Sequence, residues 1–159
     1  MGHSSTSHVL IEQSICFYGA GSMAEAILRG LVNRSVVIPG QVTMLNRSNQ
    51  DRLNYLIQRY GVTVVSNEDQ RDQALQEAGI IVLAMKPIDA AAALRQLSPL
   101  LQPNQLLVSV IAGLEIQTIQ ELLGKPQPIA RTMPNTSSTI GLGATGIVYS
   151  DEVSAEQRT

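Results

Sequence analysis

Residues 19–24 of the chain read GAGSMA and have the spacing of a phosphate-binding turn. The pattern is G-x-G-x-x-A, and it comes directly after the short apolar run at 15–18. In such a turn Gly19 permits the change of direction, Gly21 lets a pyrophosphate approach the backbone, and Ala24 lets the next helix pack closely. The start of that helix offers N–H groups and a positive dipole end to phosphate. The pattern predicts a dinucleotide site; the alternative is a tight turn without a ligand.

The residues after the second apolar run indicate which dinucleotide is bound. Folds that prefer NAD usually carry Asp or Glu at this point, where it holds the ribose 2′-hydroxyl. Here the run is followed by Asn46, Arg47 and Ser48, so no carboxylate repels a 2′-phosphate. The guanidinium of Arg47 can pair with that phosphate and its neighbours can add hydrogen bonds, while Ser48 can also cap the next helix. We therefore predict NADP(H) as the preferred cofactor, with NAD(H) possible.

Polar or small residues also follow the later apolar runs. Asn67 comes after the third run and can cap a helix, reach the adenosine, or do both. Lys86, in the stretch AMKP, can contact phosphate, ribose or an anionic substrate, or simply be solvated. After the fifth run, Ala112 and Gly113 leave room for a flat cofactor ring. The stretch RTMPNTSST at 131–139 follows the sixth run and contains no acid, histidine or cysteine.

The side chains that most often act as nucleophiles, bases or metal ligands form no constellation in this sequence. The two histidines, His3 and His8, lie in the N-terminal arm, and we predict no metal site. The single cysteine, Cys16, lies in an apolar run, which favours a buried strand residue over a reactive thiol. Hydride transfer from a nicotinamide needs none of these groups, because the cofactor carries the redox chemistry.

The composition narrows the class of protein and its partners. The 159 residues are 44% hydrophobic, 15% charged and 3% aromatic, which predicts an aliphatic core suited to a parallel sheet. The net charge is −2 and the eleven Lys and Arg are scattered, so we expect no nucleic-acid partner. No apolar run is long enough for a membrane span, and no signal peptide is recognisable. We expect a cytoplasmic protein that acts on a small molecule.

Short apolar runs alternate with segments of helical period along the chain. This predicts a Rossmann-like, doubly wound α/β fold, with a mostly parallel sheet and helices on both faces. The strand ends then meet at one edge, where ligands bind. The predicted strands are 15–18, 42–45, 62–65, 80–85, 106–111 and 128–132, with an edge strand at 143–150. The predicted helices are 22–34, 48–60, 68–78, one that begins at Pro87, and 115–124. The apolar face of the first is expected to include Ala26, and that of the second to include Ile57. We divide the chain into an N-terminal arm or tag remnant at 1–14, an NAD(P)-binding domain at 15–150, and the start of a further helix at 151–159.

The order and spacing of five motifs resemble those of pyrroline-5-carboxylate reductases. The resemblance covers about residues 15–159, and its motifs are GAGSMAEAI, NRS, AMKP, SVIAGLEI and RTMPNTSSTIGLGATGI. It implies reduction of 1-pyrroline-5-carboxylate to L-proline by NAD(P)H, the last step of proline biosynthesis. One departure is Ser137, where many members of the family have proline.

The resemblance also implies two sets of site residues. No residue of this chain is assigned a catalytic role, and the substrate-side candidates beside the nicotinamide are Met133, Pro134, Asn135 and Thr136. The implied cofactor contacts are Tyr18, Gly19, Ala20, Gly21, Ser22, Met23, Asn46, Arg47, Ser48, Asn67, Ala84, Met85, Lys86, Pro87, Val110, Ile111 and Ala112.

In that family an all-helical second domain forms a dimer or higher oligomer and binds the substrate carboxylate. We expect residues 1–159 to lack this domain, and therefore to bind NADP(H) with little or no turnover. Two other hypotheses stay open. One is a different small NADP-dependent oxidoreductase that acts on a 3-hydroxy acid or another cyclic imine. The other is a non-catalytic NADP-binding module.

Overall fold

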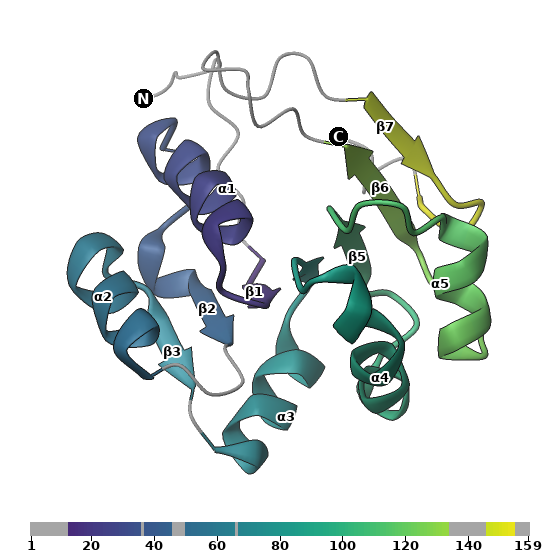
Figure 1. Ribbon diagram of the computed structural model, residues 1–159, viewed down its shortest axis with the longest axis horizontal. Helices are drawn as coiled ribbons and strands as arrows, with labels where there is room; N and C mark the ends of the chain where they lie inside the picture. Colours follow the sequence, from purple (N-terminus) through teal and green to yellow (C-terminus); the bar gives the residue numbers. More distant parts are fainter. Residues whose placement is uncertain (1–12, 36, 46–49, 66, 134–145, 155–159) are drawn as a thin grey trace, which may run out of the picture.

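Seven strands form one sheet in the part of the chain that the computed structural model describes, which is residues 13–35, 37–45, 50–65, 67–133 and 146–154 (Figure 1). The order across the sheet is β3-β2-β1-β4-β5-β6-β7, and β7 alone of these runs antiparallel to its neighbour. This order confirms the predicted doubly wound sheet. Strands β2 and β3 are added on one side of β1, and the strands from β4 onward are added on the other side. The strands are β1 Ile15–Tyr18, β2 Val42–Leu45, β3 Thr63–Val65, β4 Ile80–Leu83, β5 Leu106–Ser109, β6 Ile129–Met133 and β7 Gly146–Tyr149.

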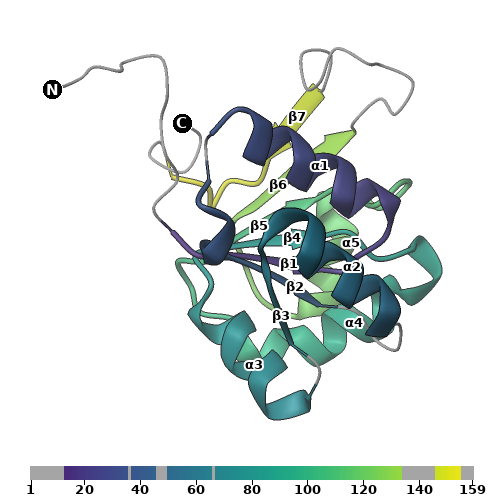
Figure 2. The same ribbon diagram turned by 90° about the vertical axis from the view of Figure 1, so that its left-hand side faces the viewer.

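Helices cover both faces of the sheet, with α1 and α2 on one side and α3, α4 and α5 on the other (Figure 2). No helix in the described ranges is both long and apolar enough to cross a membrane. The helices are α1 Ser22–Asn33, α2 Gln50–Tyr60, α3 Glu68–Glu77, α4 Pro87–Leu97 and α5 Ile116–Leu123, with short 3-10 turns at Pro39–Gln41 and Ser98–Leu100.

Each face of the sheet has its own aliphatic core. On one side Leu28 of α1 and Leu56 of α2 pack near Phe17 of β1. On the other side Leu94 of α4 belongs to the cluster that contains Cys16. Burial raises the pKa of the Cys16 thiol to about 12, so this cysteine stays a neutral thiol at physiological pH. The prediction of a buried strand cysteine is confirmed.

The structure corrects several predicted boundaries and faces. Strand β4 ends at Leu83 and β5 at Ser109, each earlier than predicted, because the backbone leaves the sheet to form the loops at its carboxyl edge. In α1 the apolar face was predicted to include Ala26, which is exposed, because Ala24 is the residue that packs against the sheet. Ile57 of α2 is 39% exposed, although it was also assigned to an apolar face. Residues 151–152 form a turn, and 155–159 lie outside the described residues.

A buried amide connects the end of α3 to the start of β5. The side-chain nitrogen of Gln105 donates to the carbonyl oxygens of Leu75 at 2.7 Å and Ala78 at 2.6 Å, and the side chain is 3% exposed. These carbonyls lie at the C-terminus of a helix, where no intrahelical partner is available.

Replacing Gln105 with leucine is therefore expected to leave buried carbonyl oxygens unsatisfied. The expected loss is about 2 kcal/mol in the free energy of unfolding, which urea denaturation measures. Gln102→Leu makes the same change at an exposed side chain three positions earlier. Equal losses for the two variants would contradict this role for Gln105.

Candidate functional site

The glycine turn lies at the carboxyl end of β1, at the centre of the sheet (Figure 1). Gly19 has a φ of +114°, which side chains of L-residues rarely adopt. A Cβ atom at this position would lie 2.8 Å from the carbonyl carbon and oxygen of Ala84 and 2.9 Å from the nitrogen of Met85. The turn therefore packs directly on the backbone of the AMKP stretch. Two motifs that are far apart in the sequence form one surface.

The second glycine of the turn lies at the start of α1, where no neighbouring atoms crowd the backbone. Gly21 is the N-cap of α1, and a Cβ there would meet nothing within 4 Å. None of the side chains that the structure describes caps this helix. Its first N–H groups and the positive end of its dipole can therefore receive an anion. The turn and the helix start fit the pyrophosphate of a dinucleotide, because the backbone is open where the phosphate must approach.

The start of α3 differs, because it already has a side-chain cap. The side-chain oxygen of Asn67 accepts a hydrogen bond of 2.8 Å from the backbone N–H of Gln70. The helix-capping role predicted for Asn67 is confirmed, and its contact with adenosine stays a prediction.

The loops after β4 and β5 flank the turn at the same edge. The backbone N–H of Ala84 donates to the carbonyl of Tyr18, and that of Val110 donates to the carbonyl of Leu83. Lys86 is exposed and precedes Pro87, the first residue of α4. Beyond β5, the side chain of Ile111 is buried in the core, so at that position only the backbone is available to a ligand. Ala112 is exposed.

Some predicted site residues lie outside the described residues. These are Asn46, Arg47, Ser48, Pro134, Asn135 and Thr136, together with the side chains of Ser22 and Met133. The backbone of Met133 is described and ends β6, on the carboxyl edge of the sheet next to β5. The cofactor-selecting and substrate-side roles of this group stay predictions.

A polar cluster that the sequence did not predict lies beside the turn. Glu25 of α1 is 7% exposed, and its carboxylate accepts hydrogen bonds from the hydroxyls of Tyr60 at 2.7 Å and Tyr55 at 3.0 Å. Arg52 of α2 pairs with the same carboxylate at 2.7 Å and donates from Nε to the carbonyl of Ala20 at 2.8 Å. The available signal was the position of Glu25 between buried Ala24 and Leu28, where a helix facing the core normally carries an apolar residue.

These contacts control the ionisation of Glu25. Burial by itself raises the pKa of this carboxyl, but hydrogen bonds from Tyr60, Tyr55 and Arg52, with the positive charge of Arg52, lower it to about 2. Glu25 is therefore a carboxylate throughout the physiological range, and the cluster is a paired ionic contact between α1 and α2.

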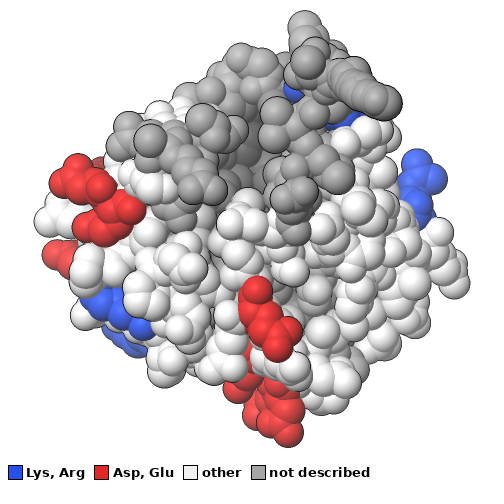
Figure 3. Space-filling view, turned by 180° about the vertical axis from the view of Figure 1, so that it is seen from behind, with Lys and Arg blue, Asp and Glu red and all other residues white. Residues whose placement is uncertain are grey.

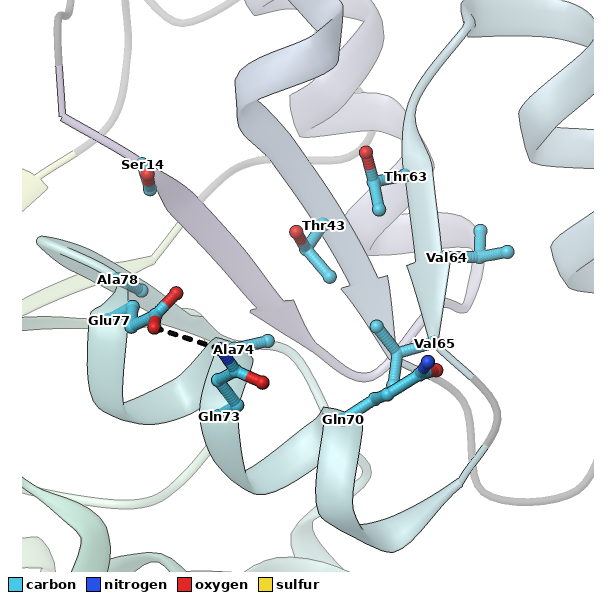
Figure 4. A pocket seen from close by; sticks show the side chains of 10 residues that line it. All are labelled: Ser14, Thr43, Thr63, Val64, Val65, Gln70, Gln73, Ala74, Glu77 and Ala78. Atoms are coloured by element: carbon cyan, nitrogen blue, oxygen red, sulfur yellow. Dashed lines mark hydrogen bonds between the residues drawn. The ribbon is translucent and has the colours of Figure 1, made fainter.

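A cavity of about 320 Å³ lies elsewhere, between α3 and the strands β2 and β3 (Figure 4). Thr43, Thr63 and Glu77 contribute polar groups to its wall, and Gln73 donates a hydrogen bond to Glu77 at 3.1 Å. Its lining includes Ser14, which precedes β1, and no residue of the glycine turn. Ligands of doubly wound sheets bind beyond the carboxyl ends of the strands, which is where the turn lies.

The charged side chains that the structure describes form no basic stripe on the face seen in Figure 3, where Lys and Arg lie in small separate groups. A doubly wound sheet with this turn between β1 and α1 defines a dinucleotide-binding domain of the Rossmann type.

The chain belongs to the family described as NADP oxidoreductase, coenzyme F420-dependent, whose model matches residues 14–113. The family description agrees with the NADP(H) that the sequence predicts.

Relatives with curated names support a narrower resemblance. The chain is 39% identical over 145 residues to pyrroline-5-carboxylate reductase 1 of Bacillus spizizenii, an alignment that covers 91% of this chain and 48% of the relative. It is 39% identical over 142 residues to pyrroline-5-carboxylate reductase 2 of Bacillus subtilis, with 89% and 50% covered. The chain thus spans about half the length of these relatives.

Solved structures of pyrroline-5-carboxylate reductases are also similar to this chain. A pyrroline-5-carboxylate reductase from Coxiella burnetii matches with a TM-score of 0.83 and 31% identity, covering 93% of this chain and 53% of that one. The Plasmodium falciparum pyrroline carboxylate reductase, solved with NADP bound, matches in fold with a TM-score of 0.75 at 23% identity, covering 94% and 52%. The resemblance to pyrroline-5-carboxylate reductases and the predicted fold class are confirmed.

Proposed function

We propose that this chain is the dinucleotide-binding part of a pyrroline-5-carboxylate reductase, which reduces 1-pyrroline-5-carboxylate to L-proline with NADPH. The observation that carries the proposal is the packing of the glycine turn on the AMKP backbone. A Cβ atom on Gly19 would lie only 2.8 Å from the carbonyl group of Ala84. That contact joins two of the motifs on which the resemblance rests, at the edge of the sheet where a dinucleotide binds.

The residues of the chain would hold the cofactor in three places. The N–H groups at the start of α1, after Gly21, bind the pyrophosphate. Arg47, with Asn46 and Ser48, binds the 2′-phosphate through charge-assisted hydrogen bonds. The small residue Ala112, exposed after β5, leaves space for the nicotinamide ring. When bound, the reduced nicotinamide supplies the hydride that the C=N carbon of the substrate accepts.

The protein's part in catalysis is then to hold the nicotinamide ring and the C=N carbon of the substrate in contact, in the orientation that hydride transfer requires. Met133, which ends β6, and the three residues that follow it in the sequence would form one wall of the substrate site, with the side chains of Asn135 and Thr136 orienting the imine. Alignment of this kind can supply a large share of the rate acceleration. It requires no nucleophile or paired acid from the chain.

The cofactor preference is expected to show directly in binding. NADPH should bind more tightly than NADH, and Arg47→Gln should weaken NADPH about tenfold or more while leaving NADH nearly unchanged, because only NADPH has the 2′-phosphate. Titrations that follow the fluorescence of the reduced nicotinamide measure both constants. Equal affinities of the unsubstituted chain for NADH and NADPH would sink the assignment of Arg47.

The reaction itself is tested on the full gene product. Oxidation of NADPH should depend on 1-pyrroline-5-carboxylate and yield proline. A panel of 3-hydroxy acids and other cyclic imines distinguishes the main proposal from another oxidoreductase of the same family. Binding of NADPH without turnover of any of these compounds would favour a non-catalytic module.

The organisation of the protein completes the proposal. Residues 15–150 are the NAD(P)-binding domain, the location is cytoplasmic, and the full gene product is a homodimer or higher oligomer. The match of the family model to residues 14–113 supports the first of these statements. Light scattering on the purified gene product tests the oligomeric state.

A further inference from the structure

Arg52 connects the glycine turn to α2. Its Nε donates a 2.8 Å hydrogen bond to the carbonyl oxygen of Ala20, the residue between the two glycines of the turn. A terminal nitrogen of the same guanidinium pairs with Glu25 at 2.7 Å. One side chain of α2 is therefore bonded both to the turn and to the helix that follows the turn.

The Arg52 guanidinium is itself held in place. Its side chain is 23% exposed and that of Glu25 is 10% exposed, so water screens their attraction only in part. The hydroxyls of Tyr55 and Tyr60 donate to the second oxygen of Glu25 and keep the carboxylate oriented. The planar guanidinium suits this arrangement, because it presents donors along two edges at fixed angles.

The consequence for the turn follows from peptide geometry. The peptide between Ala20 and Gly21 is planar and trans, so its carbonyl oxygen and its N–H point in opposite directions. When Arg52 fixes the carbonyl of Ala20 toward α2, it also fixes the N–H of Gly21 away from α2. Gly21 is the N-cap of α1, where the backbone is open.

We propose that Arg52, held by Glu25, is a positioning residue for dinucleotide binding, which acts by orienting the Gly21 amide toward the pyrophosphate. The inference rests on the proposed cofactor binding. It predicts equal effects on NADPH and NADH, since both contain the pyrophosphate. A direct contact of Arg52 with the 2′-phosphate would instead affect NADPH alone.

The test compares Arg52→Lys with the unsubstituted chain. Lysine keeps the charge next to Glu25 but has a single donor group, so it does not reproduce the two-sided contact. We expect the dissociation constants of NADPH and NADH to rise by the same factor, about tenfold, while the melting temperature changes little. Both are measured on the folded chain, at a temperature well below its melting transition.

Arg59→Lys is the matched control, because Arg59 is exposed on the same helix, with its guanidinium carbon 5.9 Å from the ring centre of Tyr60. This variant should bind both cofactors normally. Glu25→Gln supplies a second variant, and it should weaken both cofactors by a common factor because Arg52 loses its anionic partner.

A loss confined to NADPH, or unchanged constants in Arg52→Lys, would overturn the inference. A lowered melting temperature with unchanged constants would show a purely structural role and overturn it too. Failure of the unsubstituted chain to bind either cofactor is a separate result, which overturns the proposed function itself.

Discussion

Gly19→Ala is expected to abolish measurable NADPH binding and to lower the free energy of unfolding by about 3 kcal/mol or more. Two independent effects combine at this position. The φ of +114° is strained for any residue with a side chain, and the added methyl group would lie 2.8 Å from the backbone of Ala84. The contact of the methyl group cannot be relieved by a side-chain movement, because the atoms that it meets belong to the main chain directly after the central strand β4.

Gly21→Ala is the matched variant, and it separates the effect of an added methyl group on stability from its effect on cofactor binding. Gly21 has a φ of −81°, which alanine adopts readily, and a Cβ there meets nothing within 4 Å. Its stability should stay within about 0.5 kcal/mol of the unsubstituted chain. Its affinity for NADPH should nevertheless fall, because the methyl group occupies the approach of the pyrophosphate. Urea denaturation and cofactor titration measure the two effects. A Gly21→Ala chain that binds NADPH normally would count against the proposed position of the pyrophosphate.

Glu25→Gln is expected to lower the free energy of unfolding by about 3 kcal/mol at pH 7, since it leaves the Arg52 guanidinium, 23% exposed, without its anionic partner. Gln keeps the size of the side chain, so the loss reports on charge and hydrogen bonding. Glu68→Gln makes the same change at an exposed carboxylate at the start of α3 and should have a much smaller effect.

The pH dependence of the same site has a definite sign. The pKa of Glu25 is lowered from 4.5 to about 2 in the folded chain, so folding is favoured by the ionised form. This contribution is fully present above about pH 4.5 and is lost as the pH falls toward 2, with a total of about 3 kcal/mol.

The difference in stability between the unsubstituted chain and Glu25→Gln should therefore shrink across that window. Denaturant titrations at a series of pH values measure it, and the comparison cancels the other carboxylates. A difference that stays constant from pH 6 to pH 2.5 would contradict the assigned ionic contact.

The sequence predicted best the strands at the centre of the sheet and the turn that follows the first of them. Strands β1, β4 and β5 are buried by helices on both faces, so each appears as a nearly continuous apolar run and could be located within two residues. Their ends were less predictable, because apolar residues such as Ile111 continue into the loops and are buried there. The glycine turn was recognisable because its spacing, between a strand and a helix, reflects a backbone requirement that few other contexts impose.

The polar cluster at Glu25 was not predictable in the same way. Its members come from two helices, and Arg52 is 32 positions from Ala20 in the chain. Hydrophobic period identifies which face of a helix is buried, but it does not identify which polar groups of two helices will meet. The choice between the several charged residues of α2 depends on the angle and register at which α1 and α2 pack on the sheet.

The sequence by itself determined the order of the elements, the glycine turn between β1 and α1 and the family resemblance, because each depends on residue types at fixed spacing along the chain. The tertiary structure alone decided that the glycine turn rests on the backbone of Ala84, and that Arg52 binds the turn through the carbonyl of Ala20. Both contacts join segments that are distant in sequence. Their distances are set by how the strands align and the helices pack, and no local pattern contains that information.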